Sequence, residues 1–131
     1  MRSNEHAEVL LRKAREDEFA LEKLIDDPAS PDDILGFHAQ QAVEKALKAV
    51  LALHGVRYPF IHDLKTLVDL ARDNKISFPQ EMDEVKHLTP FATIFRYEYS
   101  PAEARRALDR SWALELVRRI RAWAEAFVRG S

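Results

Sequence analysis

Three short segments of this sequence carry side chains that can bind a ligand or move a proton. They are Gln41-Ala42-Val43-Glu44-Lys45-Ala46-Leu47-Lys48, His62-Asp63 and Phe95-Arg96-Tyr97-Glu98-Tyr99. Carboxylate, imidazole and guanidinium groups gathered in one site can transfer protons and hold a phosphate group. What the protein does therefore depends on whether its fold brings these segments together.

The first segment has helical spacing. Gln41, Glu44 and Lys48 share one helix face, so that Gln41 and Glu44 can pair at i+3 and Glu44 and Lys48 at i+4. Two interpretations stay open. The segment is either a solvent-facing ladder, stabilised by a few tenths of a kcal/mol per pair, or the polar wall of a site or dimer contact.

The second segment places His62 at a predicted helix start, where it either fixes the loop and caps the helix or orients a phosphate group. The five histidines show no metal-ligand spacing, so we expect no metal site. The sequence contains no P-loop and no dinucleotide-binding motif, so we expect no cofactor. The absence of cysteine excludes disulfides, thiolate zinc sites and a cysteine nucleophile.

The third segment sets Arg96 among aromatic residues at a junction between helices. Its guanidinium can bind a phosphate group through two hydrogen bonds and can stack on a ring or a base. The alternative is a buried arginine that pairs with Glu44 or Glu98 and holds the helices together.

The chain has 131 residues, of which 32% are charged and 47% hydrophobic. These values are typical of one globular domain, and we expect residues 1–131 to form it. No apolar run approaches the roughly 20 residues of a membrane span, and the N-terminus has no apolar stretch of signal-peptide type. We therefore expect a soluble, cytoplasmic protein without membrane contact.

The pattern of apolar residues is helical throughout and predicts an all-α fold. We expect an antiparallel up-and-down four-helix bundle with an additional short or kinked helix, because short connections make sequential helices antiparallel. The expected helices run from Asn4 to Ile25, from Pro31 to Leu53 after Ser30 as N-cap, from His62-Asp63 to about Arg72, from Pro79 with a kink or restart at Pro90, and from Pro101 to Val128 after a capping box over 100–103.

Charge is unevenly spread along the chain, although the net charge is only −2. Residues 1–35 carry more acidic than basic groups, and residues 101–131 carry seven arginines against four acids. The two segments either form complementary faces side by side, or the arginines form a surface for an acidic partner or a phosphate backbone.

The order and spacing of these segments resemble the HEPN domain (higher eukaryote and prokaryote nucleotide-binding). The likeness rests on Gln40-Gln41-Ala42-Val43-Glu44-Lys45-Ala46-Leu47-Lys48-Ala49, then Gly55, His62-Asp63-Leu64 and Arg96-Tyr97, and it covers about residues 5–128. It implies a helical bundle that often forms a homodimer and is often paired with a small nucleotidyltransferase, as in toxin–antitoxin modules.

Many HEPN proteins are metal-independent ribonucleases, whose motif is an Arg followed after four to six residues by a His. In that chemistry the Arg stabilises developing charge and the His moves protons. Arg96 matches the Arg, but none of the residues 97–103 is His.

We therefore expect a module that binds nucleotide or RNA phosphate, with Arg96, Tyr97, His62, Lys48, Glu44 and Gln41 as candidate site residues. It is expected to dimerise and to partner a minimal nucleotidyltransferase in a toxin–antitoxin-like system. One alternative is a ribonuclease toxin that uses Arg96 with another base. The other is a purely structural bundle, in which Arg96, Glu44 and Lys48 only hold the helices together.

Overall fold

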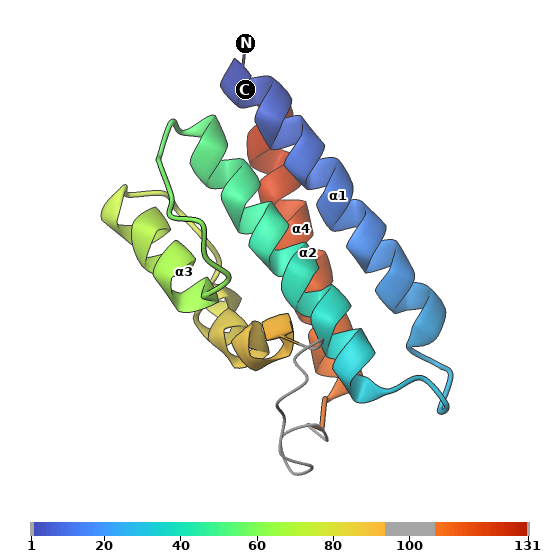
Figure 1. Ribbon diagram of the computed structural model, residues 1–131. Coiled ribbons are helices and arrows are strands. Elements are labelled where there is room, and N and C mark those ends of the chain that lie inside the picture. Colours follow the sequence, from blue (N-terminus) through green and yellow to red (C-terminus); the bar gives the residue numbers. More distant parts are fainter. Residues whose placement is uncertain (1, 94–106, 131) are drawn as a thin grey trace.

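The protein is described here from a computed structural model, which covers residues 2–93 and 107–130. No strand occurs over these two ranges, and the expectation of an all-α fold is confirmed. The five helices, shown in Figure 1, are α1 (Arg2–Leu24), α2 (Asp32–Leu53), α3 (Leu64–Asp73), the 3-10 helix η1 (Gln80–Thr93) and α4 (Arg110–Gly130).

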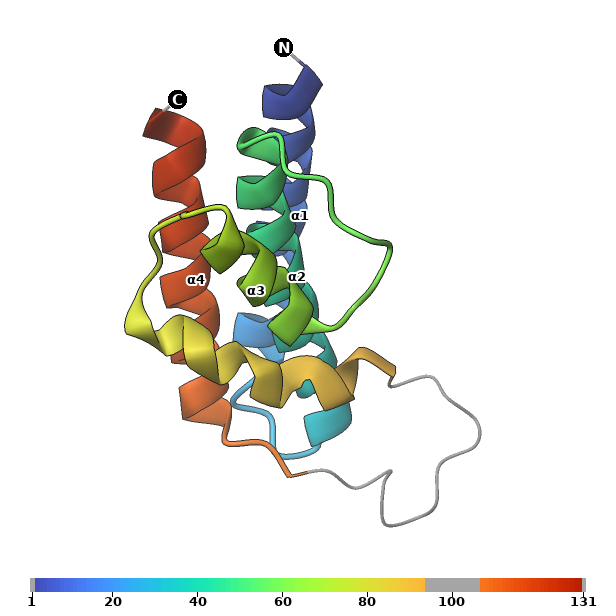
Figure 2. The same ribbon diagram turned by 90° about the vertical axis from the view of Figure 1, so that its left-hand side faces the viewer.

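The three long helices lie side by side, with α1 antiparallel to both α2 and α4 (Figure 2). Near one end, the ring centroids of His54 on α2 and Phe127 on α4 lie 5.2 Å apart. Near the other end, Arg110 Nε donates to Asp32 Oδ1 over 3.0 Å. The helices α2 and α4 therefore run in the same direction, and the N- and C-terminal ends of the described chain lie at the same end of the long helices (Figure 1).

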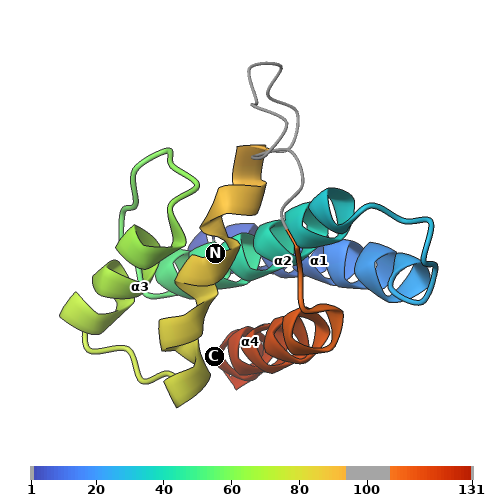
Figure 3. The same cartoon turned by 90° about the horizontal axis from the view of Figure 1, so that it is seen from below.

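Two short elements, α3 and η1, lie where a further long helix would complete a bundle. The helix α3 packs on α2, and η1 lies across α2 and α4 toward their lower ends, as seen from below in Figure 3. Leu64 N donates to Thr89 Oγ1 over 3.2 Å and ties the start of α3 to η1. Together these elements cover the side of α2 that α1 and α4 leave open.

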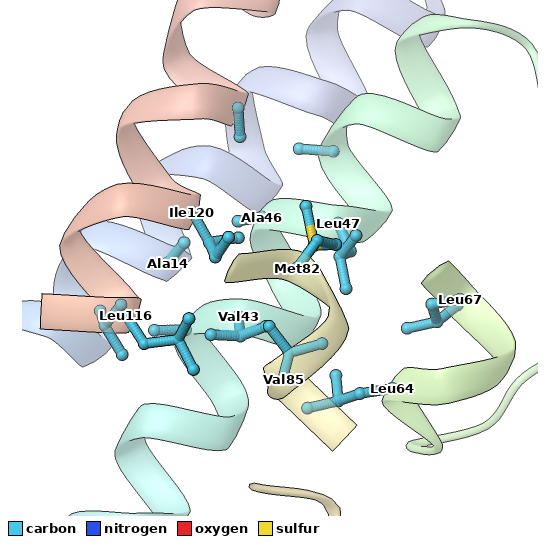
Figure 4. Close-up of a cluster of buried hydrophobic side chains, with 14 of the residues drawn as sticks. Ala14, Val43, Ala46, Leu47, Leu64, Leu67, Met82, Val85, Leu116 and Ile120 are labelled. Atoms are coloured by element: carbon cyan, nitrogen blue, oxygen red, sulfur yellow. The ribbon is translucent and has the colours of Figure 1, made fainter. Parts of the chain in front are cut away.

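The core is centred on α2, which contacts all four other helices. Its alanines at 39, 42, 46 and 49 are fully or almost fully buried and let the neighbouring helices approach closely. Apolar side chains from every helix meet there (Figure 4), among them Ala14, Val43, Leu47, Leu64, Met82, Val85, Leu116 and Ile120. Most of the apolar residues of α2 therefore belong to the core.

The start of α2 differs by one residue from the prediction. Pro31, not Ser30, is the N-cap residue, with an extended backbone (φ −66°, ψ 140°). The buried Ser30 instead belongs to the preceding turn, where its N–H donates to Asp27 O and its carbonyl accepts from Arg110 Nη2 over 2.7 Å. Ser30 is thus held by α4, and the helix begins after it.

One arginine holds the whole turn between α1 and α2. Arg110 Nη1 donates to Ile25 O over 2.8 Å and to Asp27 O over 3.0 Å, in addition to its bonds with Ser30 and Asp32. The planar guanidinium, with five donors in a fixed fork, suits several acceptors at once.

The segment after Pro79 is a 3-10 helix, whereas the pattern of its apolar residues predicts an α-helix. Met82, Val85, Leu88 and Phe91 are buried at intervals of three residues. Side chains at i and i+3 eclipse in a 3-10 helix, so this spacing places all four on one side. Of the kink or restart predicted at Pro90, the restart does not occur, since η1 runs through this residue.

The start of the last helix is also corrected. Residues 107–109 are not helical, and α4 begins at Arg110 instead of Pro101. Asp109 supplies the cap, because its Oδ1 accepts from Trp112 N over 3.1 Å. The capping box predicted at 100–103 lies outside the described residues.

Candidate functional site

Glu44 is the centre of a polar cluster on α2. Its Oε1 accepts from Gln40 Nε2 over 2.8 Å, and its Oε2 accepts from Lys48 Nζ over 3.0 Å. The spacing of four residues puts Gln40, Glu44 and Lys48 along one line of the helix. The pairing of Glu44 with Lys48 is as predicted, whereas Gln41 donates to Gln40 Oε1 over 2.7 Å and not to Glu44.

This polar line is not the solvent-facing ladder that was one interpretation of the sequence. The Glu44 side chain is 5% exposed and that of Lys48 is 11% exposed. Tyr58 and His62, from the loop before α3, lie against Lys48 and Glu44. Burying an ion pair costs desolvation energy that the attraction repays only with good geometry and further hydrogen bonds. Glu44 obtains such bonds from Gln40 and His62.

His62 joins the cluster from the loop before α3. Its Nδ1 lies 2.9 Å from Glu44 Oε1 and 3.1 Å from Oε2, and Gln40 Nε2 donates to the His62 carbonyl over 3.2 Å. An ionised carboxylate can only accept, so Nδ1 donates to Glu44 and Nε2 is left for a ligand, as an acceptor when the ring is neutral and as a donor when it is protonated. With 55% of its side chain exposed, His62 is the member of the cluster that can meet a ligand.

Two aromatic rings stand over Lys48. Its ammonium lies 5.4 Å from the ring centroid of Tyr58 and 6.0 Å from that of Phe60, within cation–π range. Burial, together with the nearby charge of Glu44, raises the pKa of the Tyr58 hydroxyl. That hydroxyl lies 3.2 Å from His6 Nε2, which links this loop to the start of α1.

Lys45 belongs to a different cluster. Its Nζ lies 2.6 Å from Asp17 Oδ2, and Asp17 Oδ1 lies 3.1 Å from His38 Nδ1. This second histidine–carboxylate pair bridges α1 and α2. The polar residues of the first predicted segment thus divide between two clusters, with Lys45 in one and Gln41, Glu44 and Lys48 in the other.

Arg96 and Tyr97 lie outside the described residues. The structure does place the element before them: η1 brings Phe91 onto Gly36, one turn before Gln40 on α2. The proposed contacts of Arg96 and Tyr97 with a phosphate group stay predictions.

The acidic and basic ends of the chain lie side by side, as one interpretation of the charge distribution required. Arg121 Nε and Nη2 donate to the buried Glu18 over 2.7 and 3.1 Å. Arg118 and Glu22 form a further ion pair between α4 and α1 at 3.4 Å. Arg118 and Arg121 form ion pairs with acidic residues of α1, so they do not form an open basic surface.

Sequence reasoning missed Gln40 as a member of the site. Gln40 is completely buried and donates both to Glu44 and to the His62 backbone. The sequence does contain a signal for Gln40. Gln40, Glu44 and Lys48 follow one another at intervals of four residues and therefore lie on one face of the helix. Within the described ranges, no group of three or more His, Asp or Glu could hold a metal ion.

Comparison with known proteins identifies the family. A family model described as HEPN domain matches residues 7–127, which is most of the chain. No curated protein and no solved structure was found to match. None of the described helices is both long enough and apolar enough to cross a membrane. On the strength of a match that extends from α1 to α4, the chain belongs to the HEPN domain family.

Proposed function

We propose that this protein is a HEPN-type module that binds nucleotide or RNA phosphate beside the Glu44 cluster. His62 makes the direct contact, since its ring is half exposed. Glu44, Lys48 and Gln41 position it from α2. Arg96 and Tyr97 are the proposed phosphate ligands from the segment after η1.

The observation that carries this proposal is the buried Glu44–Lys48 pair, to which an exposed imidazole is attached. HEPN domains are generally nucleotide- or RNA-related, which sets the class of ligand. A buried ion pair is weak as a source of stability, and apolar residues of similar volume often serve as well or better. A half-exposed histidine oriented by a carboxylate is, in contrast, a common arrangement for contact with a substrate.

The same pair favours a second candidate, a metal-independent ribonuclease. His62 Nε2 has the lone pair that can accept the proton of a ribose 2′-OH while that oxygen attacks the adjacent phosphorus. The 5′-oxygen leaves and takes up a proton from the imidazolium or from water. Arg96 would stabilise the charge that develops on the phosphoryl oxygens.

The proposal includes a homodimer, a minimal nucleotidyltransferase partner and a toxin–antitoxin-like role, as the family suggests. It also treats the fold as a variant of the up-and-down four-helix bundle, with α3 and η1 in the place of one helix. Light scattering of the purified chain and co-purification with a nucleotidyltransferase encoded beside it test the assembly. A monomer that ignores this partner would contradict it.

The site is tested by RNA binding and by an RNA-cleavage time course in EDTA. The variants are Arg96→Ala and His62→Ala, and His38→Ala is the matched control, since His38 also pairs with a carboxylate but lies between α1 and α2. We expect weaker binding for the first two variants and wild-type binding for the control. Cleavage lost in both site variants would favour the ribonuclease, and equal binding by all four proteins would exclude the site.

A further inference from the structure

Phe60 is the most exposed large apolar side chain in the described part of the protein, with 97% of its surface open to solvent. Leaving a phenylalanine in water forgoes about 1.5–3 kcal/mol of burial energy. Isolated exposed apolar residues are common on proteins and need no function of their own. Phe60 differs from such residues in two respects: its backbone is part of a tight turn, and polar groups lie near its ring.

The backbone holds Phe60 at the apex of a tight turn. Ile61 N donates to Pro59 O over 2.9 Å, which makes Phe60 the central residue of a three-residue turn. Pro59 fixes its own φ angle. On either side the loop is anchored, by Tyr58 over Lys48 and by His62 on Glu44. The backbone at Phe60 is therefore held in place before binding, so that only the ring itself has to be ordered by a ligand.

Polar and cationic groups surround the ring. The His62 ring centroid lies 6.4 Å away and the Lys48 ammonium 6.0 Å away. Arg57, three residues earlier, is exposed, and it forms no ion pair with any residue in the described ranges. An aromatic face with cations beside it is the arrangement that proteins use to hold single-stranded nucleic acid, because every base has a face that can stack.

We infer that Phe60 is a stacking platform for an unpaired RNA base, with Arg57 and His62 beside it for the backbone phosphates. This inference rests on the proposed function and names its ligand as single-stranded RNA. A base inside a duplex is already stacked on both faces, so the platform requires an unpaired base. A protein partner fits less well. Stable protein interfaces bury about 800 Å² on each partner around an apolar centre, and the other exposed large apolar residues, Val9, Phe19 and Ile34, lie on α1 and α2 and not on this loop.

The test is fluorescence anisotropy with the full chain and a labelled oligouridylate, an oligoadenylate and an RNA duplex. Phe60→Ala should weaken binding of both single strands by about 5- to 150-fold, and Phe60→Trp should restore it. Phe19→Ala is the matched control, since Phe19 is 61% exposed on α1, and it should bind as the wild type does. Arg57→Gln should weaken all single strands alike and reduce the salt slope by about 0.7.

Because Phe60 is almost fully exposed, Phe60→Ala should keep the wild-type denaturation midpoint, and a loss of binding is then not a loss of fold. Binding of single-stranded RNA that survives Phe60→Ala would overturn the inference and leave the proposed function standing. Loss of co-purification with the nucleotidyltransferase, without loss of RNA binding, would make the ring a protein contact instead. Absence of any nucleotide or RNA binding by the wild type would overturn both.

Discussion

Gly36 on α2 lies directly against the ring of Phe91 on η1. A β-carbon built on Gly36 would fall 2.2 Å from Phe91 Cδ1, far inside van der Waals contact. The crossing of η1 over α2 therefore depends on the missing side chain. We expect Gly36→Ala to destabilise the protein by about 1–3 kcal/mol through overpacking, measured as a lower midpoint of urea denaturation.

Two variants separate this cause from a general effect of alanine. Gly130→Ala, at a position with nothing within 4 Å of the new β-carbon, should leave the midpoint unchanged or slightly raised. Phe91→Leu, combined with Gly36→Ala, should recover part of the loss. If the loss of stability in the double variant equals the sum of the losses in the two single variants, the two residues do not act on one another.

The Glu44–Lys48 pair predicts that removing both charges costs less stability than removing one of them. Glu44→Ala leaves the buried ammonium of Lys48 without its carboxylate and should cost about 3–5 kcal/mol in the free energy of unfolding. Glu44→Leu with Lys48→Met removes both charges and should be clearly more stable than Glu44→Ala. Chemical denaturation of the three proteins provides the comparison, and a double variant as unstable as Glu44→Ala would show that charge burial is not the cause.

Variants of Arg110 separate the contribution of hydrogen-bond geometry to stability from the contribution of charge. Arg110→Ala should lower the free energy of unfolding by about 2–3 kcal/mol, because the charge-assisted hydrogen bonds to the α1–α2 turn are lost. Arg110→Lys keeps the charge near Asp32 but cannot supply the fork of donors, so it should recover only a minor part. Full recovery by lysine would mean that the ion pair alone matters.

Glu125 predicts a pH dependence of stability. Burial by itself would raise the pKa of Glu125, but the hydrogen bond from Arg15 and the charges of Arg129 and Arg121 outweigh it and hold the pKa below the ordinary 4.5. A depressed pKa contributes stability above the unfolded-state pKa, and this stability is lost as the pH falls through the folded-state value.

Glu125→Gln should therefore cost about 1 kcal/mol near pH 7 and progressively less below pH 4.5, as measured by thermal unfolding across the pH range. Glu16→Gln is the control. Glu16 forms only an exposed pair with Lys13 at 3.5 Å, and its removal should change little at any pH. An effect of Glu125→Gln that is constant with pH would contradict the assignment.

The long helices were predictable because their apolar residues recur with the α-helical period over many turns. The ends of α1 and α2 fall within two residues of the expected ones. The 3-10 form of η1 was not predicted, because apolar residues at intervals of three also occur in amphipathic α-helices. The interval of three from Met82 to Phe91 is satisfied better by a 3-10 helix.

The site was predictable only in part. His62 and Glu44 were both candidates, but their contact spans 18 residues and depends on the path of the loop, which no local pattern specifies. The cover of Lys48 by the ring of Tyr58 likewise depends on a residue that comes ten positions later. The role of Arg110 was not predictable, because three of its four acceptors are backbone carbonyls, which every residue has.

The hold of Arg110 on the first turn also bears on the order in which the protein folds. Its contacts join residues 78 to 85 positions apart, and such distant contacts form late because the chain between them must first be ordered. During synthesis, α1 and α2 are complete long before residue 110 exists. The turn between α1 and α2 therefore lacks its hydrogen bonds with Arg110 until this residue, near the other end of the chain, has been synthesised.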